Sequence, residues 1–287
     1  MPSQTLAPHG PRARRSKVTS AAGAVGCIRG GDTGATSGFV GTGFAENVAI
    51  TVLEMGERKI IARRAALELR PGVRVNLGIG LPEGVSAVAV EEGASGRMTP
   101  STGPGGFGAS AITGPPSRFD VPDGSGLDIC FLGLAQADRH GNLDVGRPGL
   151  RPAGGGGFIN LSQSTKAVIF VGTFTTGGLE IAVEEGSIRI VKEGARRTFV
   201  KEVGHRAFSG SQAFGNGRKV LYVTERCVFR LAEKGLELIE IAPGVDLDRD
   251  ILGRMDFTPI LARDLKLMDY RIFREEPMGL LDLLPRE

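Results

Sequence analysis

The sequence of 287 residues has no tryptophan and two tyrosines, and its formal net charge is only +3. Proteins that bind single-stranded nucleic acid stack the bases on aromatic rings, and nucleic-acid-binding faces usually carry clustered basic residues. A chain with few large aromatics and a small net charge is therefore not expected to have a nucleic acid as its partner.

Cysteine and histidine are also scarce. The cysteines are Cys27, Cys130 and Cys227, and the histidines are His9, His140 and His205. The cysteines are far apart and show neither metal-ligand nor disulfide spacing. No two histidines have the spacing of zinc ligands, so we expect no metal site and no metal-dependent hydrolysis. The cysteine pattern favours a reduced, cytoplasmic setting.

Long apolar runs are missing as well. No stretch approaches the roughly 18 apolar residues of a transmembrane helix, so we expect no membrane partner. Residues 1–20 mix proline, serine and arginine without the apolar segment of a secretory signal. Their arginines and their lack of acidic residues faintly resemble a transit peptide. A disordered tail over residues 1–21 is the simpler expectation.

Two common catalytic motifs are absent from the sequence. There is no G-x-S-x-G nucleophile elbow, and no glycine loop is followed by the lysine of a P-loop. Phe208-Ser209-Gly210 lacks the flanking glycines of the elbow, and we interpret it as a turn. A Ser–His–Asp triad stays open, because its members need not be close in sequence.

Glycine, by contrast, is abundant, with 44 residues. This is roughly twice the usual share of about 7%. The glycines cluster between apolar runs, as in residues 103–108 and 154–157, where they let the backbone approach a ligand closely. The second cluster could offer bare N–H groups to an oxyanion. Alternatively, it is a loop that lets two strands cross tightly.

One glycine pattern occurs twice, as Gly41-Thr42-Gly43-Phe44 and as Gly78-Ile79-Gly80-Leu81. Each copy follows a strand-like run and precedes a helix-like one, which indicates duplicated α/β halves unless the match is coincidental. In the second copy we expect a strand over residues 73–77, Pro82 in the first helical turn, and a helix stop at Gly93. A helix that starts after G-x-G can bind an anion.

The rest of the chain alternates apolar runs with turns. Further strands are expected over residues 127–134, 167–171, 220–223 and 236–241, with a turn at residues 138–142. Residues 181–183 and 188–191 should form a hairpin, and Asp246 should cap a short helix. Together these elements predict an α/β chain with a mixed sheet.

Longer motifs carry a family resemblance. The segment from Val75 to Val85, V-N-L-G-I-G-L-P-E-G-V, resembles the start of the second half of class I acyl-CoA:carboxylate CoA-transferases, in their propionate and acetate branch. The similarity runs over about residues 58–280. It includes His140-Gly141-Asn142, G-G-F-I-N from Gly156, G-T-F-T from Gly172 and T-E-R from Thr224. The resemblance implies an open, largely parallel sheet with flanking helices.

The resemblance also implies a domain organisation. Residues 28–32 and 37–46 are similar to the beginning of the family's N-terminal half, which in the family is separated from the second half by most of a domain. We therefore expect a tail over residues 1–21, a remnant of the N-terminal domain over 22–55 and the C-terminal domain over 56–287. A large deletion near residues 54–57 would bring the two halves together.

Family members use a glutamate to attack an acyl-CoA thioester, form a glutamyl-CoA thioester and pass CoA to a short-chain carboxylic acid. Coenzyme A is thus a substrate, and no other cofactor is implied. Residues 98–108, where that glutamate is expected, contain no acidic residue, and Ser101 or Thr102 stands in its place. We interpret Glu91 and Glu92 as a solvated helix end rather than as substitutes.

The resemblance assigns an oxyanion donor to the Gly156 N–H and substrate contacts to Gly78, Gly80, Gly154 and Gly157. We therefore expect a CoA-transferase with impaired turnover. The alternatives are a non-catalytic remnant that binds CoA or a partner subunit, and a fragment without function. Because most of one half is missing, apolar surface meant for it should be exposed and should favour homo-oligomers or self-association.

Overall fold

The computed structural model describes residues 54–78, 80–94, 98–102, 127–145 and 156–284. All of them belong to one compact unit (Thr36–Glu287). The expected tail, the first glycine copy and nearly all of the 22–55 remnant lie outside the described residues. Ile79, Gly154 and the 103–108 glycine cluster also lie outside them.

The described elements alternate between helices and strands. The first part of the chain forms α3 (Glu57–Ala66), β1 (Val73–Leu77), η1 (Leu81–Glu83), α4 (Gly84–Glu91), β2 (Met98–Thr102), β3 (Ile129–Gly133), β4 (Gln136–Ala137), β5 (Leu143–Asp144) and α6 (Gly156–Ser164). The middle part forms β6 (Ala167–Val171), β7 (Thr175–Thr176), β8 (Glu180–Glu184), β9 (Ser187–Lys192), β10 (Arg196–Arg197), α7 (Gly210–Gly215), β11 (Lys219–Val223), β12 (Cys227–Ala232) and β13 (Gly235–Ile241). The last part forms η3 (Leu247–Ile251), η4 (Leu252–Arg254), β14 (Ile260–Leu267), η5 (Tyr270–Phe273) and α8 (Leu280–Leu283).

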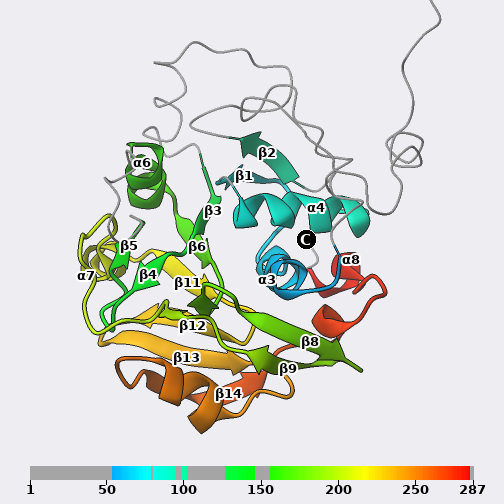
Figure 1. Ribbon diagram of the computed structural model, residues 1–287. Helices are drawn as coiled ribbons and strands as arrows, with labels where there is room; N and C mark the ends of the chain where they lie inside the picture. The colour runs from blue at the N-terminus through cyan, green and yellow to red at the C-terminus, as the bar shows by residue number, and fades with distance from the viewer. Residues whose placement is uncertain (1–53, 79, 95–97, 103–126, 146–155, 285–287) are drawn as a thin grey trace, which may run out of the picture. The chain divides into compact units, whose positions relative to one another are not determined.

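The main sheet has eight strands in the order β14-β13-β12-β11-β6-β3-β1-β2 (Figure 1). From β2 to β11 all neighbours are parallel, whereas β11, β12 and β13 are joined as antiparallel neighbours. β14 lies parallel to β13 at the far edge. The predicted open, largely parallel sheet is therefore confirmed. Its parallel neighbours are joined by crossover connections, which are usually helical.

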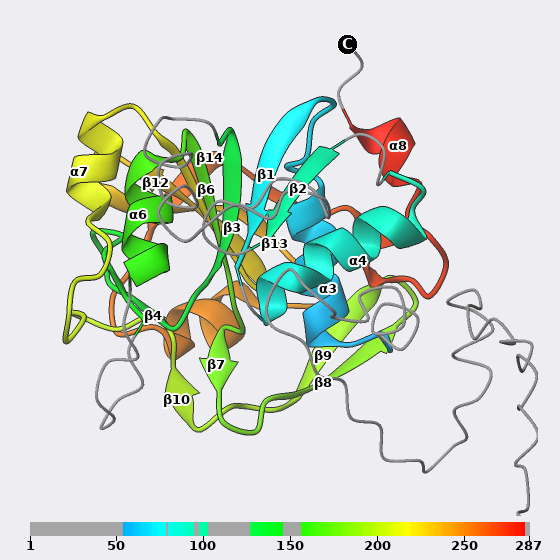
Figure 2. The ribbon, with the colours of Figure 1, turned by 90° about the horizontal axis from the view of Figure 1, so that it is seen from above.

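Helices cover both faces of this sheet. In β6 the apolar run alternates, so that Ile169 and Val171 pack into one core cluster with α3 and α4, while Val168 and Phe170 pack into the other with α6. Figure 2 shows α6 and α7 on one side and α3 and α4 on the other. Strands that are apolar on both faces are typical of a sheet buried between two helical layers.

Most expected local structures are present. The strands over 73–77 and 167–171 have the predicted bounds, and the hairpin is β8–β9, turned by Glu185 and Gly186 at positive φ. Asp246 accepts a hydrogen bond from the Arg249 N–H and so caps η3 as predicted. The interpretation of residues 208–210 as a plain turn was wrong, because Ser209 is the N-cap of α7 and accepts from the Gln212 N–H.

The C-terminal segment from η5 to α8 packs on α3 and α4. Arg63 is fully buried and donates to the carbonyl oxygens of Ile272, Arg274, Glu275 and Glu276. Glu92 accepts from the N–H groups of Met278 (2.7 Å) and Leu280 (3.0 Å). Arg63 therefore binds backbone carbonyl groups of this segment, and Glu92 binds backbone N–H groups.

Glu92 corrects an expectation from the sequence. Glu91 is exposed at the end of α4, as expected, but Glu92 is not solvated. Glu92 is only 9% exposed and is fully engaged with the C-terminal segment. Glu91 forms ion pairs with Lys59 (3.0 Å) and Arg63 (3.2 Å) of α3. Their partners lie on α3 and the C-terminal segment, which explains why the local sequence could not reveal them.

Candidate functional site

The candidate site lies at the carboxyl edge of the parallel strands, where ligands of open α/β sheets usually bind. Gly78 follows the last residue of β1, and its N–H donates to the Phe131 carbonyl of β3 at 2.8 Å. A Cβ at this position would lie 3.1 Å from the same oxygen. Glycine therefore lets the end of β1 lie against β3 without a side chain between them.

Gly80 turns the chain from the edge into the helical layer. Its φ of 90° lies in the region that only glycine adopts readily, and η1 begins directly after it. Pro82 lies in this single turn of η1 rather than in α4 itself, which begins at Gly84. The G-x-G pattern thus places a turn and then a helix N-terminus beside the carboxyl end of β1.

Gly156 and Gly157 form the first turn of α6. The first N–H groups of a helix have no partners within the helix, and they point out of its N-terminus. Because α6 leads into β6, it runs back across the sheet and its N-terminus lies toward the carboxyl edge. Its body packs on the sheet, where Phe158 stacks on Phe170 and the Cys130 thiol contacts the Leu161 carbonyl. Gly156 and Gly157 therefore begin a helix, and they do not form the loop for a tight strand crossing that was the alternative expectation.

Ser101 and Thr102 are the last two residues of β2. Ser101 pairs in register with Asn76 of β1, which pairs with Cys130 of β3. Thr102 pairs with Leu77, which pairs with Phe131. Cys130 belongs to the row that contacts α6, whereas Leu77 and Phe131 pack in the core with α3 and α4. The register therefore places the two candidate positions in different rows across the sheet.

Cys130 is not a nucleophile at this edge. Burial raises the pKa of its thiol to about 12, so it stays protonated and inert near neutral pH. Burial also raises the pKa of the Cys227 thiol. Of the described histidines, His140 accepts a hydrogen bond from Arg139 on its ring, whereas the ring of His205 is 87% exposed and lies 3.8 Å from the Asp144 carboxylate. Within the described ranges, no group of metal-ligating side chains could hold an ion.

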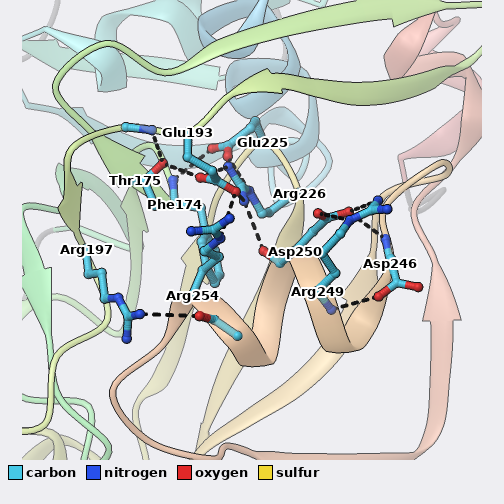
Figure 3. A network of polar contacts seen from close by, with 12 residues as sticks. Phe174, Thr175, Glu193, Arg197, Glu225, Arg226, Asp246, Arg249, Asp250 and Arg254 are labelled. Carbon is cyan, nitrogen blue, oxygen red and sulfur yellow. Dashed lines mark hydrogen bonds and ion pairs between the residues drawn. The ribbon is translucent and has the colours of Figure 1, made fainter.

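Farther along the same edge, a polar network joins the ends of β6 and β11 (Figure 3). Glu225 and Arg226, in the turn after β11, are fully buried and ion-paired at 2.7 Å. Glu225 also accepts from the Phe174 N–H, and Arg226 also pairs with Glu193 at 2.9 Å. Sequence reasoning missed this network, although a Glu-Arg pair between two apolar runs was a usable signal.

Several known proteins are similar to this chain. No model of a protein family matches the chain. The caffeate CoA-transferase of Acetobacterium woodii is 46% identical over 251 residues, which cover 81% of this chain and 48% of that protein. The acetate CoA-transferase subunit beta of Haemophilus influenzae is 30% identical over 238 residues, which cover 75% of this chain and 96% of that subunit.

The chain belongs to the CoA-transferases. The crystal structure of the acyl-CoA transferase YdiF from E. coli O157:H7, a thioester complex with CoA, superposes with a TM-score of 0.76 and 43% sequence identity. This match covers 79% of this chain and 46% of YdiF. The chain spans about half the length of the caffeate CoA-transferase, and it covers 96% of the Haemophilus beta subunit.

The sequence-predicted site residues of this CoA-transferase chain are brought together in part. Gly78 and Gly80 follow β1, Ser101 and Thr102 end β2, and Gly156 and Gly157 begin α6, all toward one edge of the sheet. Gly154 lies outside the described residues. None of the helices in the described part of the chain has the length and apolarity that a bilayer crossing requires.

Proposed function

We propose that this chain is the C-terminal half of a CoA-transferase that acts on acyl-CoA and short-chain carboxylic acids, and that its turnover is impaired. One observation carries the proposal. β2 ends at the carboxyl edge beside the Gly78 turn, and its last residues are Ser101 and Thr102, with no carboxylate. In this proposal, the chain keeps groups that bind a thioester but lacks the nucleophile.

The chemistry explains why this substitution matters. A glutamate carboxylate attacks the thioester carbonyl, releases CoA thiolate and forms a mixed anhydride. The thiolate then attacks the glutamyl carbonyl of this anhydride, which releases the substrate's carboxylate and leaves glutamyl-CoA. A serine or threonine hydroxyl cannot form that anhydride. In this proposal, the Gly156 N–H stabilises the oxyanion, and Gly78, Gly80, Gly154 and Gly157 contact the substrate. Holding a thioester equally in the ground and transition states does not accelerate transfer.

The main test is a transfer assay between propionyl-CoA and acetate, combined with trapping of a covalent adduct by hydroxylamine or borohydride. We expect no turnover and no glutamyl-CoA adduct in the natural chain, and weak CoA binding in a titration. Turnover would overturn the claim of impairment. An adduct on Glu91 or Glu92 would show that the nucleophile was misplaced.

A matched pair of variants tests the position of the site. Ser101→Glu places a carboxylate in the row of Asn76 and Cys130, which contacts α6, whereas Thr102→Glu places it in the row of Leu77 and Phe131. Incubation with propionyl-CoA should yield an adduct in Ser101→Glu and none in Thr102→Glu. An adduct in Thr102→Glu alone would contradict the assignment of the α6 face.

The second candidate is a non-catalytic remnant that binds CoA or a partner subunit. The Haemophilus relative is named a beta subunit, and 96% of its length matches 75% of this chain. CoA binding without turnover, even in Ser101→Glu, would favour this candidate.

We also propose that residues 22–55 are a remnant of the N-terminal domain and that the protein works in the cytoplasm. Sequencing of the gene around codons 54–57 and 98–107 would test whether the deletion is real.

We further propose that the chain self-associates. Several large apolar side chains are exposed, including Val191 (53%), Leu267 (65%) and Tyr270 (52%). Apolar surface of this kind promotes association when its usual cover is missing. Sedimentation at increasing protein concentration should show oligomers. A monomer at high concentration would contradict this part of the proposal.

A further inference from the structure

The turn after β11 holds the most deeply buried charges at the carboxyl edge. Thr224, Glu225 and Arg226 connect β11 to β12, and all three side chains are inaccessible to solvent. Taking a carboxylate and a guanidinium out of water is costly, and an apolar pair of similar volume often gives equal or greater stability. The location of this pair therefore calls for an explanation other than stability alone.

Both oxygens of Glu225 have a donor. Oε1 accepts from Arg226 Nε at 2.7 Å, and Oε2 accepts from the Phe174 N–H at 2.9 Å. Arg226 donates in turn to Glu193 and to the Asp250 carbonyl, both at 2.9 Å, and its guanidinium lies over the Phe174 ring at 4.8 Å. Figure 3 shows Arg226 joined to Glu225, Glu193 and Asp250, with Phe174 beside them.

Phe174 lies in the connection between β6 and β7, residues 172–174. At its start, the Gly172 N–H donates to the Val223 carbonyl, and a Cβ on Gly172 would lie 2.5 Å from the Leu134 carbonyl. Just beyond its end, the Thr175 hydroxyl donates to Glu193 at 2.9 Å. The connection therefore packs between the ends of β3 and β11. The carboxylates of Glu225 and Glu193 accept hydrogen bonds from its Phe174 N–H and from the adjoining Thr175 hydroxyl.

We propose that Glu225 is a positioning residue, whose carboxylate holds the Phe174 amide and so fixes residues 172–174 as a wall of the carboxyl edge beside β3. The part of this inference that concerns ligand binding rests on the proposed function. The geometry supports this role, because backbone hydrogen bonds join the end of each strand to the end of its neighbour in the order β1, β3, β6 and β11. Gly78 bonds to Phe131, the Leu134 N–H to Val171, and Gly172 to Val223.

Burial raises the pKa of Glu225 even though Arg226 and the Phe174 N–H oppose the shift. A carboxylate kept in such a place needs both of its donors, so an amide in its position cannot substitute. In Glu225→Gln one of the two donors must face the NH2 group. The amide oxygen should turn to Arg226, because a charged donor forms the stronger hydrogen bond. The Phe174 N–H then loses its acceptor.

Hydrogen exchange of the Phe174 amide, read by NMR, tests the positioning role in the full chain. In Glu225→Gln it should exchange faster by about tenfold or more, the factor that about 1.4 kcal/mol of lost hydrogen bonding produces. The amides of Val168 and Phe170 in β6 should not change. The control Glu184→Gln alters a carboxylate that is 63% exposed and paired with Arg189. It should change neither the exchange of the Phe174 amide nor that of the β6 amides.

CoA itself is the probe for the ligand part. Titration should show CoA affinity about tenfold weaker in Glu225→Gln than in the natural chain. Unchanged Phe174 exchange in the folded variant would overturn the positioning role, and faster exchange with unchanged affinity would overturn its link to the ligand. If Glu225→Gln does not fold, Thr175→Val loosens the same connection and must speed Phe174 exchange. If the natural chain binds no CoA, the proposed function fails, while the exchange comparison still decides the role of Glu225.

Discussion

Replacement of Glu92 should destabilise the protein although the residue lies far from the candidate site. Its carboxylate accepts from the N–H groups of Met278 and Leu280, and it is only 9% exposed. A buried donor left without an acceptor costs about 1–3 kcal/mol. In Glu92→Ala two N–H groups lose their acceptor, so we expect the free energy of unfolding to fall by about 2–4 kcal/mol.

Glu92→Gln should lie between the natural chain and the alanine variant. The amide oxygen can accept from one N–H group while the NH2 group faces the other, so we expect a loss of about 1–2 kcal/mol. Urea unfolding followed by circular dichroism measures these differences. The control is Glu180→Gln, whose carboxylate is 58% exposed and paired with Lys192, and which should change stability by less than about 0.5 kcal/mol. A Glu92→Gln variant as stable as this control would refute the reasoning.

Three further predictions can be tested in the same way. Gly172→Ala should destabilise by about 1–3 kcal/mol, because its Cβ would lie 2.5 Å from the Leu134 carbonyl, whereas Gly215→Ala in α7 meets no atom within 4 Å and should be neutral or stabilising. Tyr222→Phe removes the buried hydroxyl that donates to the Gly141 carbonyl and should cost about 1–3 kcal/mol, whereas the exposed Tyr270→Phe should cost nothing measurable. Hydrogen bonds from Arg249 hold the pKa of Asp250 below its ordinary value of 3.8, so the stability from this pair is present above that value and lost as the pH falls through the lowered pKa. Asp250→Asn should therefore flatten the loss of unfolding free energy between about pH 5 and about pH 2, and an unchanged slope would contradict the assignment.

Periodicity in the sequence was sufficient to find most of the sheet. Residues 73–77 alternate and residues 167–171 are continuously apolar, and both are strands with the expected bounds. The cap at Asp246 and the β8–β9 hairpin were predictable for the same reason, since their signals are local. The cap and the hairpin are held by local hydrogen bonds, whereas the two strands pair with distant strands and were found because their apolar patterns reflect burial in the core.

Contacts between distant segments were not predictable. Glu92 looked like a solvated helix end because its partners are 186 and 188 residues away in sequence. The choice between Ser101 and Thr102 depends on strand register, which is set by pairing with β1 and not by β2 alone. Glu225 acts on Phe174 across 51 residues. The buried polar contacts of Glu92 and Glu225 therefore depend on tertiary packing, which the local sequence does not show.

The hold of Arg63 on the C-terminal segment has a consequence for how this part of the chain can vary. Within this segment Arg63 donates to backbone carbonyl oxygens, and the side chains of Arg274, Glu275 and Glu276 are exposed. Because every amino acid supplies the same carbonyl, substitutions at these three positions leave the contact intact. An insertion or deletion of one residue would shift every carbonyl past the guanidinium, so this segment should tolerate changes of identity and resist changes of length.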